Sequence, residues 1–110
     1  MKFEKLLRKA WPYLGKYNTF SIDEKNNELC IRDCLGNRFF DIDPFNLIGV
    51  SEDIVNWLYE QNIKVHIKQL YNSQWVCQLT KNGISIAGSK SHSKEFAILI
   101  AGEKYVKVSR

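Results

Sequence analysis

Two carboxylates near the middle of the chain, Asp41 and Asp43, have the spacing that turns both side chains to one side of a strand end. Clustered carboxylates are what a metal-dependent nuclease uses to hold its cations, and Asp23 and Asp33 are candidate companions. The Glu-x-Lys pair that would complete such a centre is missing. A turn at Asp43-Pro44 that ends the strand explains the two residues more simply, so we predict no metal site.

The two histidines are the next candidates for chemistry. His66 stands between Lys64 and Lys68 in an alternating segment, so we expect it to face solvent. His92 is expected in a loop over residues 88–93, where it could bind a phosphate, cap a helix or be merely exposed. The sequence contains neither a Gly-x-Ser-x-Gly elbow nor a glycine-rich phosphate loop. We therefore predict no catalytic residues, no cofactor and no enzymatic activity.

The three cysteines favour free thiols. Cys30-x3-Cys34 has no second pair with which to form a zinc site, and Cys77 on a strand would be a small buried side chain. Reduced thiols indicate a cytoplasmic location. No apolar run approaches the ~20 residues of a membrane span. Residues 1–5 do not have the pattern of a signal peptide, so we expect no membrane contact.

Basic charge gathers at the two ends of the chain. The 110 residues carry 16 Lys and Arg against 12 Asp and Glu, a formal net charge of +4. The net charge is +4 over residues 1–16, −3 over residues 17–88 and +3 over residues 89–110. If the two ends pack side by side, they form one basic face that could meet phosphates or an acidic protein surface. Ordinary solubilising charge is the alternative interpretation.

The first half of the chain predicts a helix followed by a meander. Residues 2–11 have apolar side chains at helical spacing with lysines on the opposite side, and Pro12 should end the helix. Alternating segments separated by turns then predict a three-stranded antiparallel meander. Its strands are expected at residues 19–23, 28–32 and 38–42, and Asp43-Pro44 closes it.

A second helix is predicted to begin at Ser51. Serine is a good N-cap, and the two acidic residues that follow it suit the positive end of the helix dipole. The helix is expected to end near Asn62. Its predicted apolar face consists of Ile54, Val55, Leu58 and Tyr59, with Trp57 at the edge.

Three strands and a final element follow. The strands are predicted at residues 63–68, 75–80 and 84–87, with a hairpin turn at Lys81-Asn82-Gly83. The apolar run over residues 96–101 could belong to a helix with Ser93 as N-cap, or to a hairpin that turns at Gly102-Glu103-Lys104. We prefer the helix, although Gly102 would cost it about 1 kcal/mol, because the unbroken run suits a helix packed across a sheet.

These elements predict a single α+β domain over residues 1–110. Residues 1–50 form an N-terminal helix and antiparallel meander, and residues 51–110 form an α-β-β-β-α unit with its helices packed on the antiparallel sheet.

The order of elements over residues 51–108 resembles the double-stranded RNA-binding domain. The features that carry the resemblance are Gly83 in the turn, Gly88 after the last strand, and Ser93-Lys94-x-x-Ala97 at the start of the last helix. The resemblance implies that lysines of that helix clamp the phosphates of duplex RNA. Glu95 and Ile98 occupy the other two lysine positions of the family's signature.

The same stretch is also similar to the small phage ABA-sandwich proteins. The shared features are the order of elements, the strand that begins at Trp75 and the Ala-containing closing helix. This resemblance implies a small accessory protein encoded by a phage.

Together these observations predict a non-enzymatic binding protein from a phage or mobile element. It would bind and occlude a host protein, nucleoprotein or defence complex, as an anti-CRISPR inhibitor does. The alternative is a nucleic-acid-binding module of the double-stranded RNA-binding type, and a metal-dependent nuclease ranks last. An unpaired strand edge could also support a homodimer. The predicted binding residues are Tyr71, Lys81, Asn82, Lys90, His92, Lys94, Lys2, Arg8 and Lys9.

Overall fold

Three α-helices, one 3-10 helix and two small antiparallel sheets make up the described part of the chain. The computed structural model describes residues 2–16, 20–25, 28–33, 35, 37–39 and 46–108. In chain order the elements are α1 (Lys2–Ala10), the 3-10 helix η1 (Pro12–Lys16), β1 (Phe20–Lys25), β2 (Glu28–Asp33), β3 (Arg38–Phe39), α2 (Leu47–Glu60), β4 (Ile63–Gln69), β5 (Trp75–Lys81), β6 (Ile84–Ser91) and α3 (Lys94–Val108).

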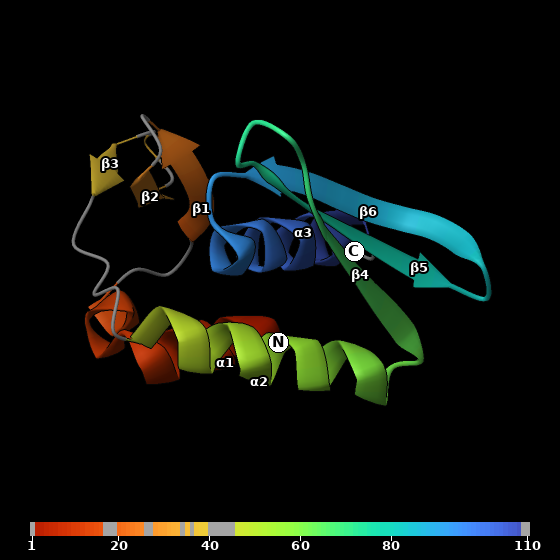
Figure 1. The fold of residues 1–110 in the computed structure, drawn as a ribbon. Coiled ribbons are helices and arrows are strands. Elements are labelled where there is room, and N and C mark those ends of the chain that lie inside the picture. The colour runs from red at the N-terminus through yellow and green to blue at the C-terminus, as the bar shows by residue number, and fades with distance from the viewer. Residues whose placement is uncertain are drawn as a thin grey trace.

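The helices and sheets are arranged in layers, and the predicted α+β class is confirmed. One sheet has the order β1-β2-β3 and the other β4-β5-β6, and all neighbouring strands are antiparallel. In Figure 1, α3 lies between the β4-β5-β6 sheet above it and the pair α1 and α2 below it. The smaller sheet lies at one end of this stack.

The predicted meander is confirmed in its order and pairing. Its first two strands pair from Phe20 with Asp33 to Lys25 with Glu28, and β3 pairs with β2. The third strand covers Arg38–Phe39 where residues 38–42 were predicted. The predicted turn at Asp43-Pro44 lies outside the described residues.

One apolar core joins α1, η1, β1, α2, α3 and the larger sheet. Its fully buried side chains include Leu7, Leu14, Ile54, Leu58 and Leu99. Ile22 of β1 belongs to the same core, and its backbone N–H donates a hydrogen bond to the Glu103 carboxylate of α3. The smaller sheet is therefore tied to the last helix by packing and by a buried polar contact.

The predicted start of α2 was wrong by one turn. The helix begins at Leu47, and Ser51 lies inside it, where its hydroxyl donates to the Ile48 carbonyl at 2.8 Å. Leu47 and Val50 are both buried, so the apolar face of the helix extends one turn further toward the N-terminus than predicted. Burial of that extra turn outweighs the capping preference of serine.

The predicted apolar face of α2 was also wrong in two places. Trp57, predicted at the edge, is only 9% exposed, and its ring centroid lies 5.7 Å from that of Phe3 and 6.1 Å from that of Tyr105. Tyr59, predicted on the apolar face, is 53% exposed. Buried residues in a helix recur every three or four positions, and Leu47, Val50 and Ile54 follow this spacing. The next position in the series is Trp57, so the buried face is centred nearer to Trp57 than to Tyr59.

The β5–β6 hairpin turns where predicted, but β6 is longer than predicted. Asn82 and Gly83 have φ angles of 55° and 77°, as a two-residue type I′ turn requires. The strand continues to Ser91, so the expected loop over residues 88–93 was wrong, and Gly88 pairs with Gln78 inside the sheet. A bulge between Leu79 and Thr80 shifts the register of the hairpin.

The final element is a helix, as preferred, and not a hairpin. The Ser93 hydroxyl caps it by accepting a hydrogen bond from the Phe96 N–H at 3.4 Å. Gly102 lies where α3 meets α1, and a Cβ there would come within 2.9 Å of the Phe3 ring. Glycine at this position lets the two helices approach closely, which accounts for a residue that helices ordinarily disfavour. Among the described residues, no helix has both the length and the apolar composition needed to cross a bilayer.

Candidate functional site

The outer face of the β4-β5-β6 sheet, on the side away from α2 and α3, carries a set of exposed basic and polar side chains. The inner side chains pack into the core, among them Ile63, Cys77 and Leu79. Because side chains alternate between the faces of a strand, their neighbours in sequence point outward. The outer face consists of Lys64, His66, Lys68, Val76, Gln78, Thr80, Ser85, Gly88 and Lys90.

Side-chain hydrogen bonds link neighbouring strands across this outer face. His66 Nε2 lies 3.0 Å from Thr80 Oγ1, and Gln78 Nε2 donates to Ser85 Oγ at 2.7 Å. The polar groups in the middle of the face are thus held in place, while the three lysines are exposed around them. Strand geometry separates Lys64 from Lys68 by about 13 Å along β4, and Lys68 from Lys90 by about 10 Å across the strands.

The charge of this sheet is of one sign. Residues 61–94 contain five lysines and neither aspartate nor glutamate. Residues 17–60 contain nine acidic residues and three basic ones, so the chain changes sign at the end of α2. A surface with several positive charges and no carboxylate within its own segment attracts polyanions, since no acidic residue of residues 61–94 offsets the lysines.

A tight turn with a fully exposed tyrosine lies at the end of this face. The turn joins β4 to β5 and includes Tyr71, one of the predicted binding residues, which is exposed. Lys68, at the end of β4, lines a hollow of about 340 Å³ together with Gln69, Leu70 and Tyr71. Tyr71 and a lysine therefore border one hollow at the edge of the basic face.

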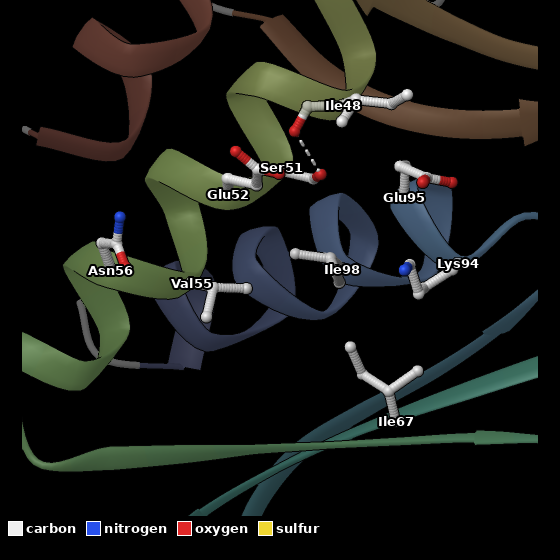
Figure 2. Close-up of a pocket in the computed structure, with 9 residues that line it drawn as sticks. All are labelled: Ile48, Ser51, Glu52, Val55, Asn56, Ile67, Lys94, Glu95 and Ile98. Carbon is white, nitrogen blue, oxygen red and sulfur yellow. Dashed lines mark hydrogen bonds between the residues drawn. The ribbon is translucent and has the colours of Figure 1, made fainter.

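A second concave surface, the α2–α3 groove, lies on the other side of the sheet. Figure 2 shows α2 and the start of α3 on its two sides, with Ile67 of β4 pointing toward both. Its volume is about 240 Å³. It is lined by Ile48, Ser51, Glu52, Val55, Asn56, Ile67, Lys94, Glu95 and Ile98. Ile48 is 59% exposed and Ile67 is 38% exposed, so the floor of the groove is apolar and open to solvent.

The structure divides the predicted binding residues among three places. Lys90, His92, Lys94 and Tyr71 lie toward the end of the sheet where Trp75 pairs with Ser91. Lys81 and Asn82 lie at the β5–β6 turn, about 20 Å away along the strands. Lys2, Arg8 and Lys9 lie on α1, which Figure 1 places on the opposite side of α3 from the sheet.

Several basic residues of α1 and α3 have partners within the fold. Lys2 Nζ lies 3.1 Å from Glu60, and Lys107 Nζ lies 2.9 Å from Glu103. The Arg8 guanidinium donates to the Leu14 carbonyl and lies 5.0 Å above the centre of the Phe20 ring. These contacts use part of the charge that was predicted to form one basic face from the two ends.

Lys64 and Lys68 were not among the binding residues predicted from the sequence. Their signal was present, because both alternate with apolar residues in β4 and the stretch around them contains no acid. The net charge of residues 17–88 combines the acidic meander and α2 with the basic sheet, and the negative total conceals the basic charge of the sheet. His66, which was expected to face solvent, is exposed on the same outer face.

The described cysteines are buried free thiols. Cys30 and Cys77 are both free and fully buried, as predicted for Cys77, and Cys34 lies outside the described residues. Burial raises the pKa of the Cys77 thiol from its ordinary value of 9.0 to about 11. A neutral thiol inside the sheet is a poor nucleophile, because the thiolate is the reactive form.

The raised pKa of Cys77 predicts a loss of stability at alkaline pH. Since the folded-state pKa exceeds the unfolded one, the stabilisation is complete below pH 9 and is lost as the pH rises toward 11. Between these values the free energy of unfolding should fall by about 2 to 3 kcal/mol more in the wild type than in Cys77→Ala. Urea unfolding of both proteins from pH 8 to pH 11 measures this difference, and parallel curves would contradict it.

Among the described residues, no group of three or more His, Cys, Asp or Glu side chains is placed to hold a metal ion. Asp41 and Asp43 lie outside the described residues. No family model, curated protein or solved structure matches this chain. The resemblances to the double-stranded RNA-binding domain and to the phage ABA-sandwich proteins stay predictions from the sequence.

Proposed function

We propose that this protein is a non-enzymatic nucleic-acid-binding protein and that its ligand lies on the outer face of the β4-β5-β6 sheet. The observation that carries the proposal is the run of residues 61–94, with five lysines and no acidic residue. Three of those lysines, Lys64, Lys68 and Lys90, share the outer face. Phosphate oxygens are the ligands that exposed lysines attract most generally.

The remaining side chains of the outer face suit a phosphate backbone rather than the edges of the bases. Thr80, Ser85 and Gln78 offer hydroxyl and amide groups that can donate to phosphate and sugar oxygens. The described residues of this face include no Phe, Tyr or Trp, and its one imidazole, His66, lies within hydrogen-bond distance of Thr80, so phosphate and sugar contacts are expected to dominate in the middle of the sheet. We expect binding with little sequence preference.

A titration of labelled oligonucleotides tests the proposal directly. Fluorescence anisotropy should show binding of single-stranded RNA or DNA at low salt and weaker binding as salt increases. Three lysine–phosphate contacts predict a slope of log K against log salt of about −2 for a single strand. Absence of binding at low salt, or affinity that does not change with salt, would contradict the proposal.

The mode predicted from the resemblance to the double-stranded RNA-binding domain has less support. It would place the duplex on Lys94 at the start of α3, because that residue matches the family's signature. Lys94 lines the α2–α3 groove together with Glu52 and Glu95. Two carboxylates beside one lysine weaken its attraction for a phosphate.

A second candidate function is the occlusion of a host protein by a phage or mobile-element product. The α2–α3 groove supports it, since an apolar floor with exposed Ile48 and Ile67 fits an apolar side chain of a partner. Glu52 and Glu95 favour a partner that carries a basic residue beside that side chain. Binding of one host protein that survives high salt and is lost in Ile48→Glu, with no nucleic-acid binding, would favour this candidate.

We also propose a cytoplasmic location. Two buried free thiols, Cys30 and Cys77, support it, because free thiols persist in reducing compartments.

A further inference from the structure

We infer that Tyr71 is a base-stacking residue and that it makes the protein prefer single-stranded over duplex nucleic acid. The inference rests on the proposed function, since a base reaches Tyr71 only if its phosphates lie on the outer face of the sheet. Lys68 connects the two places, because it belongs to the outer face and also lines the hollow beside Tyr71.

The turn that carries Tyr71 is held by its own hydrogen bonds. The Leu70 N–H donates to the Gln74 carbonyl at 2.7 Å, and the Ser73 N–H donates to the Leu70 carbonyl at 3.3 Å. The Asn72 side chain accepts from the Gln74 N–H at 3.3 Å, as in an Asx turn. The backbone that carries Tyr71 is therefore ordered before a ligand binds, and a turn that need not be ordered on binding favours affinity.

The exposure of the Tyr71 ring is not explained by the fold. The ring is fully exposed and packs against nothing in the core, in contrast to Trp57 and Trp75, which belong to the core or pack against it. A nucleobase stacked on the ring would cover this apolar surface. The hollow of about 340 Å³ beside the ring has room for a group of this size, and Gln69 in its wall can hydrogen-bond to a base edge.

Stacking on Tyr71 favours single-stranded over duplex nucleic acid, because the two ligands differ in whether the faces of their bases are accessible. A base in a single strand can turn its face toward the ring, whereas bases inside a duplex are already stacked on their neighbours. The phosphates of both ligands are accessible to Lys64, Lys68 and Lys90. The lysines therefore supply affinity for either ligand, and Tyr71 adds affinity for the single strand alone.

The test compares Tyr71→Ala and Tyr71→Phe with the wild type on a single-stranded oligonucleotide, its duplex and an abasic strand of equal length. We expect Tyr71→Ala to lower single-strand affinity by about 5- to 150-fold while leaving duplex affinity unchanged. Tyr71→Phe should keep the wild-type affinity, because the ring is retained. The wild type should bind the abasic strand about as weakly as Tyr71→Ala binds the intact one.

The possible results separate this inference from the function on which it rests. If the wild type binds both ligands with the expected salt dependence but Tyr71→Ala changes neither affinity, or changes both equally, Tyr71 is not a stacking residue and the function stands. If the wild type binds no oligonucleotide at low salt, both fail. Loss of binding to a host protein in Tyr71→Ala, with nucleic-acid binding intact, would make Tyr71 a protein-contact residue and overturn the inference.

Discussion

Replacement of Lys64, Lys68 and Lys90 together by glutamine should lower affinity for a single-stranded oligonucleotide by about 100-fold at 0.1 M salt. Each lysine–phosphate contact releases counterions from the strand, and three such contacts account for an effect of this size. The slope of log K against log salt should become flatter by about two units, because the contacts that release the ions are gone. Anisotropy titrations at four or five salt concentrations measure both quantities.

The control for this experiment is a triple variant of α1, Lys2→Gln, Lys5→Gln and Lys9→Gln. It lowers the net charge by the same amount, and all three side chains are exposed on a helix remote from the sheet. If affinity depends on the outer face, the control keeps near wild-type affinity. Equal losses in both triple variants would mean that only total charge matters. A loss confined to the α1 variant would place the binding surface on the basic ends instead.

Replacement of Trp57 by alanine should destabilise the fold by about 3 to 5 kcal/mol. The indole lies where α1, α2 and α3 meet, between the rings of Phe3 and Tyr105. Its removal leaves a large cavity and ends both aromatic contacts. Because small domains are stable by only about 5 to 15 kcal/mol, the variant should lose a large fraction of its stability and unfold at a lower temperature than the wild type. Urea and thermal unfolding followed by circular dichroism test this expectation.

Tyr59→Ala is the matched control, two residues further along the same helix. Its ring is 53% exposed, so its loss should change the free energy of unfolding by no more than about 0.5 kcal/mol. Similar destabilisation in the two variants would mean that Trp57 does not hold the three helices together. A Trp57→Phe variant should be intermediate, because it keeps a ring but with less volume.

The fold was predicted well from the sequence where a single local pattern, such as strand alternation, a turn dipeptide or a helix cap, determines the structure. The alternation of β4, the Asn82-Gly83 turn and the Ser93 cap each determine a structure within a few residues, and the structure contains all three. The start of α2 could not be predicted in this way, because two signals compete there. Ser51 favours a helix start, and burial of Leu47 and Val50 against the rest of the core decides against it.

The candidate site was harder to predict than the fold, because it depends on the pairing of strands. Tyr71 was predicted as a binding residue, and the turn that carries it leaves its side chain exposed. The grouping of Lys64, Lys68 and Lys90 needs the register between β4, β5 and β6, which alternation within each strand does not determine. The bulge at Leu79 and Thr80 adds a shift that no local pattern indicates.

The division of charge along the chain has a consequence for how the protein meets a polyanion in solution. The acidic side chains of α2, Glu52, Asp53 and Glu60, are exposed on a helix that Figure 1 places beneath α3, away from the outer face of the sheet. The basic side chains of α1 on that same side offset these acids, whereas residues 61–94 contain no acid to offset the lysines of the sheet. The net positive charge therefore lies toward the outer face, and a molecule charged in this way experiences a torque in the field of a nucleic acid. The torque would turn the outer face of the sheet toward the nucleic acid before contact. A larger share of first encounters would then lead to binding.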